Sequence, residues 1–202
     1  LILVDQYWAD PPSPDDPAQM DKLDAWQRDD LATLHAVPGV ASVAAINGLP
    51  LYDDGSFDGI GLTPNQKKNT TAAGFYYGDE QMLPTLGLRL LAGRAFRADE
   101  VLHMAMADPR DPPVVIVTKA LANKLFPGEL ANALGKAIYL RKGSTPVTII
   151  GVVERLQIPF LHQFGESYTW NSVLLPVRQD GAHTIYALRA QPGRANDVLK
   201  AV

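Results

Sequence analysis

The sequence predicts an α/β fold, because strand-like and helix-like stretches alternate along the chain. Residues 114–117 (VVIV) form a β-branched run, which is typical of a buried strand. The leucine-bearing stretch after it predicts a short helix, with Thr118 as its N-terminal cap and Pro127-Gly128 as its end. Two further apolar runs, at 137–140 and 147–153, predict two strands joined by a turn.

The N-terminal part predicts a strand, a helix and a second strand. Residues 1–8 are mostly apolar and strand-like. Asp16 can cap a helix over 17–37, in which apolar residues form a stripe and Pro17 occupies the first position. Pro38-Gly39 ends that helix, and residues 40–46 predict the second strand.

The middle of the chain is less regular at first. Residues 49–73 are rich in Gly, Asp, Asn and Pro and predict a loop with room for one short strand. A short strand at 75–77 then leads into a helix over 81–86. Gly87 ends that helix, because the residue after a helix often adopts a positive φ that glycine takes at little cost. Residues 101–113 predict a polar loop.

The C-terminal part begins with an aromatic, irregular stretch at 158–170. Residues 172–177 and 184–190 predict two strands, with a turn at 179–181 between them. A final helix is expected from about Ala195.

Composition excludes several classes of protein. With 202 residues the chain can bury a real core, and 47% hydrophobic residues is ordinary for a globular domain. A net charge of -4 argues against a nucleic-acid partner, and the lack of cysteine excludes disulfides and thiolate metal sites. No apolar run approaches the roughly 20 residues that span a bilayer, and the first residues do not predict a signal peptide. Both ends look cut from a longer chain.

No motif for catalysis or nucleotide binding is present. The sequence has no G-x-S-x-G elbow and no phosphate-binding G-x-x-x-x-G-K-[ST] loop. Carboxylate pairs such as Asp79/Glu80 and Asp99/Glu100 are typical of helix starts and turns, since acid/base pairs need environments that separate their pKa values. We therefore expect a protein that is not an enzyme and needs no cofactor.

Metal sites are poorly supported. The four histidines are scattered, and only the run from His103 to Met106, with its imidazole and thioethers, offers soft ligands for Cu(I). The acidic run 53–59 lacks the alternating ligands and distal Glu of a calcium loop. We expect both runs to be loops without a metal.

Arg94 and the aromatic residues each allow a functional and a structural interpretation. Arg94 could contact a partner, but a structural ion pair with Asp99 is the commoner outcome. Tyr7, Trp8, Trp26 and Trp170 could form a cage, but burial in a core is the commoner fate. The stretch 158–170 follows neither the strand nor the helix period. It is the best candidate for an exposed partner surface, with the aromatic residues Phe160, Phe164, Tyr168 and Trp170.

Six short motifs occur in a fixed order between residues 86 and 153. They are Leu86-Gly87-Leu88, Leu90-Leu91-Ala92-Gly93-Arg94-Ala95-Phe96, Val115-Ile116-Val117-Thr118, Leu121-Ala122 with Leu125-Phe126-Pro127, Leu134-Gly135-Lys136, and Ile149-Ile150-Gly151-Val152-Val153. Together they resemble the extracytoplasmic (periplasmic) core domain of MacB-type ABC transporter permeases of the FtsX superfamily. This chain departs from the family pattern at Thr118, where Asn is common, and in a longer 101–113 loop.

The resemblance identifies a set of signature residues that would be structural. They are Gly87, Gly93, Arg94, Phe96, Gly135 and Gly151. The resemblance also implies an α/β (α+β) fold of two subdomains. A porter-like, βαβ-type subdomain would combine residues 1–74 and 157–202, and a second small mixed α/β subdomain would be inserted as residues 75–156.

The function that the resemblance implies is mechanical. The domain would lie in the periplasm, as part of a bacterial inner-membrane permease, and would couple cytoplasmic ATP hydrolysis to movement outside that membrane (export or mechanotransmission). Its partners would be a cytoplasmic ATP-binding cassette subunit, a second permease copy and, in part of the family, a periplasmic adaptor.

Two alternatives belong to other classes. A regulatory module that binds a periplasmic ligand or protein without transport would show an apolar groove between the subdomains and bind one ligand tightly. A hydrolase-like enzyme would need a nucleophile and base within hydrogen-bond reach, and the sequence offers no such set.

Overall fold

The computed structural model describes residues 1–13, 16–52, 55–105, 108–160 and 165–202. The helices are α1 (Pro17–Ala36), α2 (Met82–Leu86), α3 (Lys119–Leu125) and α4 (Ala195–Ala201). The strands are β1 (Ile2–Tyr7), β2 (Val40–Ile46), β3 (Ser56–Gly61), β4 (Thr71–Gly78), β5 (Leu90–Gly93), β6 (Leu102–Ala105), β7 (Val114–Thr118), β8 (Ala137–Leu140), β9 (Val147–Val153), β10 (Ser172–Asp180) and β11 (His183–Ala190). The predicted α/β class is confirmed.

Within the described residues, six of these strands close into a ring. The hydrogen-bonded order is β4-β3-β8-β9-β7-β10, and β10 pairs in parallel with β4 to complete the circuit. We call this ring the barrel. The strand β5 pairs with β9 and β6 pairs with the end of β10, so both extend the barrel at its margins.

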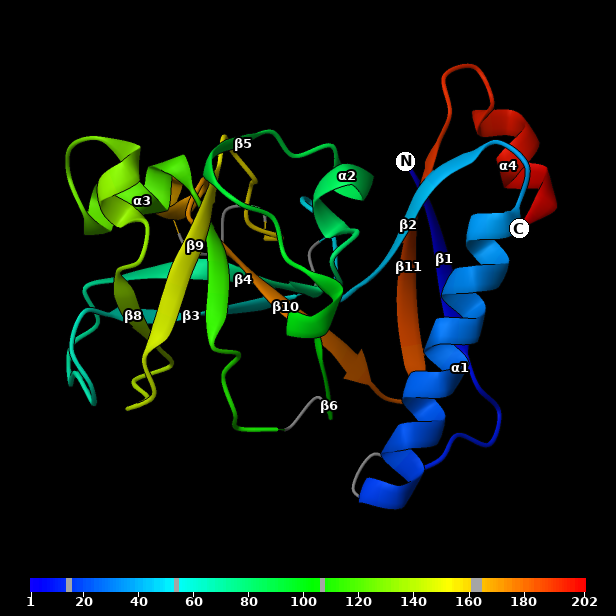
Figure 1. The fold of residues 1–202 in the computed structure, drawn as a ribbon, viewed down its shortest axis with the longest axis horizontal. Coiled ribbons are helices and arrows are strands. Elements are labelled where there is room, and N and C mark those ends of the chain that lie inside the picture. Colours follow the sequence, from blue (N-terminus) through cyan, green and yellow to red (C-terminus); the bar gives the residue numbers. More distant parts are fainter. Residues whose placement is uncertain (14–15, 53–54, 106–107, 161–164) are drawn as a thin grey trace.

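A second, smaller sheet is attached to the barrel. In it β11 lies between β1 and β2, antiparallel to both. We call β1, β11 and β2, with the helices α1 and α4, the outer sheet. Figure 1 shows the outer sheet at one end of the molecule, with α1 and α4 on the side that faces away from the barrel.

Alternation of side chains along the strands produces three hydrophobic clusters. In β7, Val115 and Val117 point into the barrel, whereas Ile116 points outward. In β11, Tyr186 and Leu188 pack under the helices of the outer sheet. The alternate residues of β11, Ile185 and Ala187, pack toward α2 and the barrel wall. The barrel and the outer sheet therefore each have their own interior, and a third cluster lies between them.

Most predicted elements are present, and β5 and β6 are strands that were not foreseen. Residues 56–61 (SFDGIG) form β3 where the prediction was a loop with room for one short strand, because β4 and β8 supply backbone partners on its two sides. Residues 102–105 form β6 inside the predicted 101–113 loop, where β10 supplies the partner. Both β3 and β6 depend on pairing with distant segments. The predicted subdomain boundaries at 1–74, 75–156 and 157–202 stay a prediction.

The predicted cap at Thr118 is wrong in its side-chain contact. Thr118 does precede α3, but its hydroxyl makes no capping bond to the helix. The hydroxyl instead donates to the carbonyl of Trp170 at 2.6 Å and accepts from the amide of Ser172 at 3.1 Å. These contacts place the start of β10 against the end of β7. The Thr118 hydroxyl therefore bonds to the distant strand and not to a backbone amide of α3.

Candidate functional site at the junction of the barrel and the outer sheet

The barrel and the outer sheet meet at a narrow neck. The strand β2 pairs with β4 through one residue pair, Ile46 with Gly78. Asn47 extends this contact, because its amide oxygen accepts from the Tyr77 backbone N–H at 2.9 Å and its amide nitrogen donates to the Phe75 carbonyl at 3.2 Å. The chain itself crosses between the two parts from β2 to β3 and again in the turn from β10 into β11. The sheet thus continues from one part to the other through very few hydrogen bonds.

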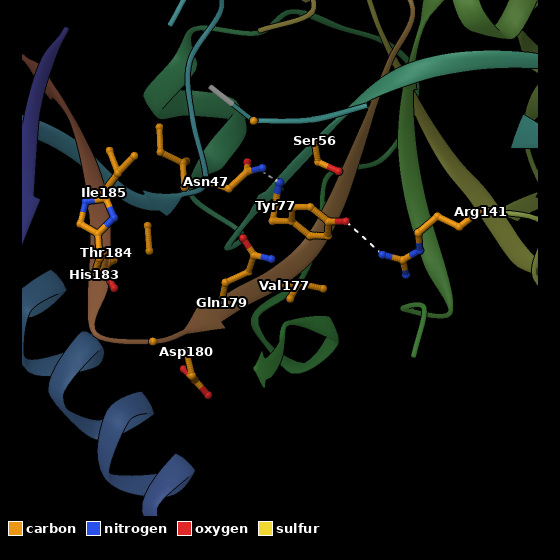
Figure 2. Close-up of a pocket in the computed structure, with 14 residues that line it drawn as sticks. Asn47, Ser56, Tyr77, Arg141, Val177, Gln179, Asp180, His183, Thr184 and Ile185 are labelled. Atoms are coloured by element: carbon orange, nitrogen blue, oxygen red, sulfur yellow. Dashed lines mark hydrogen bonds between the residues drawn. The ribbon is translucent and has the colours of Figure 1, made fainter. Parts of the chain in front are cut away.

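A cavity of about 370 Å³ opens beside this neck. Figure 2 shows His183, Thr184 and Ile185 of the outer sheet on one side, with Tyr77 and Arg141 of the barrel on the other. The Arg141 guanidinium donates to the Tyr77 hydroxyl at 3.2 Å and also pairs with Asp111. Burial raises the pKa of the Tyr77 hydroxyl. The cavity is lined by mixed polar and apolar groups, so it is not the apolar groove expected of a static ligand-binding module.

Asp79 links the two parts from a buried position next to the neck. Its two carboxylate oxygens accept from the backbone N–H groups of Ala45 at 3.1 Å and Gln81 at 2.9 Å. The side chain is buried, and this burial raises the pKa of Asp79 to about 6. Its environment therefore favours the protonated form more than water does.

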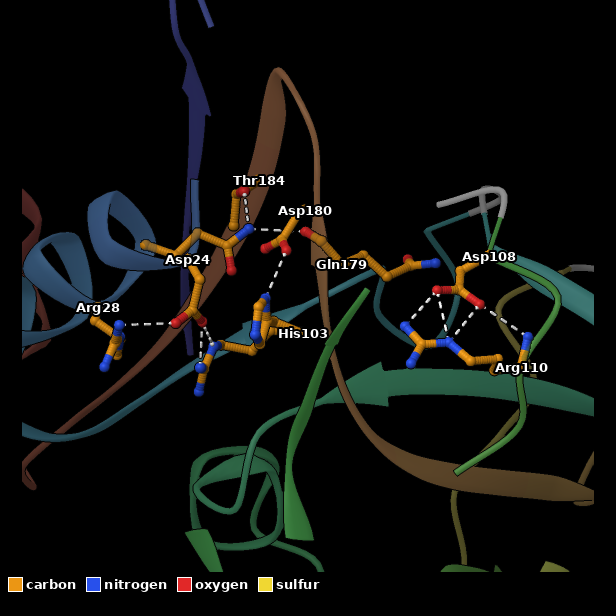
Figure 3. Close-up of polar contacts among 10 residues, drawn as sticks. Asp24, Arg28, His103, Asp108, Arg110, Gln179, Asp180 and Thr184 are labelled. Atoms are coloured by element: carbon orange, nitrogen blue, oxygen red, sulfur yellow. Dashed lines mark hydrogen bonds and ion pairs between the residues drawn. The ribbon is translucent and has the colours of Figure 1, made fainter. Parts of the chain in front are cut away.

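The helix α1 is tied to β10 by a second polar group of contacts (Figure 3). Arg178 forms an ion pair with Asp24, and Arg28, one turn along α1, approaches the other Asp24 oxygen at 2.9 Å. The Gln27 amide nitrogen donates to the Gln179 carbonyl at 2.7 Å and to the Thr184 hydroxyl at 3.0 Å. These contacts hold α1 against the turn that joins the barrel to the outer sheet.

Asp180 ends β10 at the same place. Its side chain is fully buried, and one oxygen lies 3.3 Å from His103 Nδ1 on β6. Burial raises the pKa of Asp180, although His103 opposes that shift. Figure 3 shows Asp24, His103 and Asp180 converging from α1, β6 and β10. No sequence motif predicts this cluster, since Asp24 and its partner Arg178 are 154 residues apart.

The signature glycines lie in three places. Gly93 and Gly151 are opposite each other where β5 pairs with β9, and a Cβ at either position would lie within 3 Å of the other strand's backbone. Gly87 caps α2 in the left-handed conformation, as predicted. Gly135 also has a positive φ, of 73°. None of these glycines lines the junction cavity.

Arg94 and Phe96 have structural surroundings. The Arg94 guanidinium donates to both oxygens of Glu100, at 2.7 and 2.6 Å, and this contact lowers the pKa of Glu100 to about 2. The predicted partner, Asp99, pairs with Arg97 instead, because the turn at 98–100 directs Glu100 back toward Arg94. Phe96 is buried in the cluster between barrel and outer sheet.

The predicted partner surface is divided. Trp170 is 43% exposed, with Arg155 over its ring, and Phe160 and Tyr168 are half-buried. Ile158, in the same stretch, is buried. Phe164 lies outside the described residues. A partner role for Phe160, Phe164, Tyr168 and Trp170 stays a prediction.

Core burial is wrong for Tyr7, Trp8, Trp26 and Trp170. Tyr7 is 69% exposed and stacks on His183, Trp26 is 38% exposed and contacts the half-buried Trp8, and Trp170 is exposed as described above. Tyr7, Trp8 and Trp26 belong to surface elements of the outer sheet, whose core is filled by aliphatic residues and Tyr186.

The soft-ligand site has no support among the residues described. Met104 is buried inside the barrel cluster, on the opposite side of β6 from His103 as strand alternation requires. Met106 and the acidic pair at 53–54 lie outside the described residues. The expected loop over 53–59 is wrong for residues 56–59, which lie in β3, where Asp58 accepts from the neighbouring Gly59 N–H at 2.6 Å.

Comparisons with known proteins agree on one family. The family model described as "MacB-like periplasmic core domain" matches residues 2–202. No curated protein sequence matches this chain. Among the described residues, no helix combines the length and the apolar character needed to cross a membrane.

Two solved structures share the fold. The periplasmic region of MacB from Actinobacillus actinomycetemcomitans is 21% identical, with a TM-score of 0.55, and the match covers 86% of this chain and 69% of that one. The extracellular domain of the noncanonic ABC-type transporter YknZ from Gram-positive bacteria is 16% identical, with a TM-score of 0.52, and covers 84% and 76%. At these identities the likeness concerns the fold.

Proposed function

Since this chain belongs to the MacB-like periplasmic core domain family, we propose that it is the non-catalytic periplasmic part of an ABC transporter permease and acts by moving. In this proposal the full-length permease sits in a bacterial inner membrane and pairs with a cytoplasmic ATP-binding cassette subunit and a second permease copy. A periplasmic adaptor is a further partner. ATP hydrolysis inside the cell would be coupled to displacement of this domain, for export or for mechanical signalling.

The observation that carries the proposal is the narrow neck. The barrel and the outer sheet each have their own hydrophobic interior, so the proposed movement changes the packing of the cluster between them and leaves both interiors intact. The sheet connection is the single pair Ile46 with Gly78, assisted by Asn47. A hinge needs few residues that absorb a rotation between two well-packed bodies, and this junction has that character.

The proposal is tested by distances in the full-length permease assembled with its cassette. The chain contains no cysteine, so labels can be introduced at the exposed positions Thr33 on α1 and Asn123 on α3 without a background from this domain. Double electron–electron resonance should give a Thr33→Cys/Asn123→Cys distance distribution that changes when ATP is added.

A matched pair within the barrel serves as the control. Asn123→Cys with Ser144→Cys, both exposed, should give the same distribution with and without nucleotide. Unchanged Thr33–Asn123 distances while the cassette hydrolyses ATP would contradict the proposal and favour a static binding module.

A further inference from the structure

Three potential metal ligands meet where α1 approaches the ends of β6 and β10. One ligand atom each from Asp24, His103 and Asp180 lies within 4.8 Å of the other two. The Asp24 and Asp180 side chains are 8% and 0% exposed, whereas His103 is 39% exposed. The cluster is therefore buried on the carboxylate side and open to solvent on the imidazole side.

Two buried acceptors at this place have no donor within the described part of the chain. Among the described residues, Asp180 Oδ1 is buried without a hydrogen-bond partner, and so is Gln27 Oε1. Gln27 is one helical turn from Asp24, and its amide nitrogen is bonded to Gln179 and Thr184 on either side of the Asp180 turn. Its orphaned oxygen therefore belongs to the same buried region. Native interiors rarely leave such acceptors unpaired, and a bound cation is one way to satisfy them.

We propose that Asp24, His103 and Asp180 bind a divalent transition-metal cation, with zinc as the representative. An imidazole nitrogen with carboxylate oxygens is a ligand set that zinc accepts, whereas calcium and magnesium prefer all-oxygen sites. Three protein ligands leave a fourth position for water. His103 Nδ1 and Asp180 Oδ2 are 3.3 Å apart. Tetrahedral zinc with ligands at about 2.0–2.1 Å requires a spacing of about 3.3 Å between neighbouring ligands.

Two arginines compete with the metal at Asp24. Arg178 contacts Asp24 Oδ1 through two nitrogens, and Arg28 contacts Oδ2 at 2.9 Å. A carboxylate has about four acceptor positions, so these contacts leave one for a metal. Asp180 and His103 are therefore the principal ligands and Asp24 is the weakest. A metal here fastens α1 to β6 and β10.

The test is isothermal titration calorimetry, in which zinc chloride is titrated into the chelator-treated 202-residue chain. We expect one zinc per chain. His103→Ala and Asp180→Asn should each lower the affinity at least about tenfold, the loss that removal of a principal ligand produces. His35→Ala, on the exposed last turn of α1, is the matched histidine control and should bind zinc as the parent does.

Two further readouts separate ligation from a loss of folding. Cobalt(II) should give tetrahedral d–d absorption with the parent and with His35→Ala, but not with His103→Ala, whose partly exposed side chain can be removed with little disturbance. Arg28→Gln should bind zinc more tightly, because its arginine is 60% exposed and competes for Asp24. Circular dichroism checks that each variant is folded.

Several results would overturn the assignment. These are no zinc uptake by the parent, equal uptake by the parent and His103→Ala, an equal loss in His35→Ala, or stronger binding of calcium or magnesium than of zinc. Weaker zinc binding by Arg28→Gln would overturn the role of Asp24 as a ligand.

Discussion

Gly93 and Gly135 have nearly the same backbone conformation and different surroundings. Their φ values are 76° and 73°. A Cβ on Gly93 would lie 2.1 Å from the carbonyl oxygen of Ile150, across the β5–β9 pair, whereas a Cβ on Gly135 would meet no atom within 4 Å. The two positions therefore separate the cost of a left-handed backbone from the cost of a clash.

We expect Gly135→Ala to lower the free energy of unfolding by about 1–2 kcal/mol, the cost of placing a side chain in the left-handed region. Gly93→Ala adds a backbone collision that must push β5 away from β9, so its loss should exceed about 3 kcal/mol. Urea denaturation monitored by circular dichroism measures both. Equal losses in the two variants would show that β5 can move away from β9 at little cost.

Asp79, which lies at the neck, makes a contribution to folding stability that depends on pH. Its pKa rises from 3.8 to about 6 in the folded chain, chiefly through burial, with Glu80 adding to the rise and Arg178 opposing it. The folded state thus holds the proton more tightly than the unfolded state between pH 4 and 6. By linkage, the contribution of Asp79 to stability is greatest at and below pH 4 and declines as the pH rises through 6.

Asp79→Asn cannot titrate, so the comparison with the parent isolates this effect. Relative to the parent, the variant should be least stable at and below pH 4 and should gain about 2 kcal/mol between pH 4 and pH 7. Guanidinium denaturation at a series of pH values gives the two curves. Parallel curves would mean that Asp79 has an ordinary pKa in the folded chain.

At the scale of elements, the Thr118 hydroxyl joins two segments that are distant in sequence. It connects the β7–α3 corner to Trp170 and Ser172, and all of these groups are buried or partly buried. Replacing it leaves a buried amide and a carbonyl without their partner.

Thr118→Val should therefore lower the stability by about 1–3 kcal/mol, the cost of an unsatisfied buried group, whereas Thr118→Ser should stay within about 1 kcal/mol of the parent. Thr118→Asn is the discriminating variant, since asparagine is a good helix cap but is too large for the space between β7 and β10. Chemical denaturation measures the stability of each variant. If Thr118→Asn were as stable as the parent, the side chain at position 118 would act as a cap of α3 after all.

Elements with a local signature could be predicted from the sequence, and those that depend on distant partners could not. The β-branched run of β7, the glycine after α2 and the Pro-Gly after α3 each act through neighbouring residues. The strand β3 contains two glycines and an aspartate, and only its two neighbours make it a strand. Likewise, Asp24 and Asp180 looked like ordinary acidic residues, because their burial arises from contacts between α1 and the end of β10.

For the whole molecule, the distribution of tryptophan allows the two parts to be followed separately. Trp8 and Trp26 are in the outer sheet part and Trp170 is beside the barrel, and the chain has three tryptophans in all. The cluster between the parts contains Ile185 of the outer sheet and Ile116 of the barrel, so unfolding one part exposes the apolar surface of the other.

The variant Trp170→Phe keeps only the tryptophans of the outer sheet part, and the double variant Trp8→Phe/Trp26→Phe keeps only the one beside the barrel. The fluorescence transitions of these two variants in urea should therefore coincide. Adding Asn47→Ala, which removes two hydrogen bonds of the neck, should separate the two midpoints. Separate transitions before Asn47 is changed would show that the shared cluster does not couple the parts.

The pairing of β1 with β11 has a consequence for biosynthesis. Ile2 lies opposite Leu188, so β1, which is made before the other described strands, has its only described strand partner in β11, the last of them. The barrel strands end at Asp180, whereas the outer sheet lacks its middle strand until His183 and the residues after it are made. The order of synthesis thus imposes an order of assembly, in which the barrel strands pair first and β2 waits with Val43 and Ile46 unprotected.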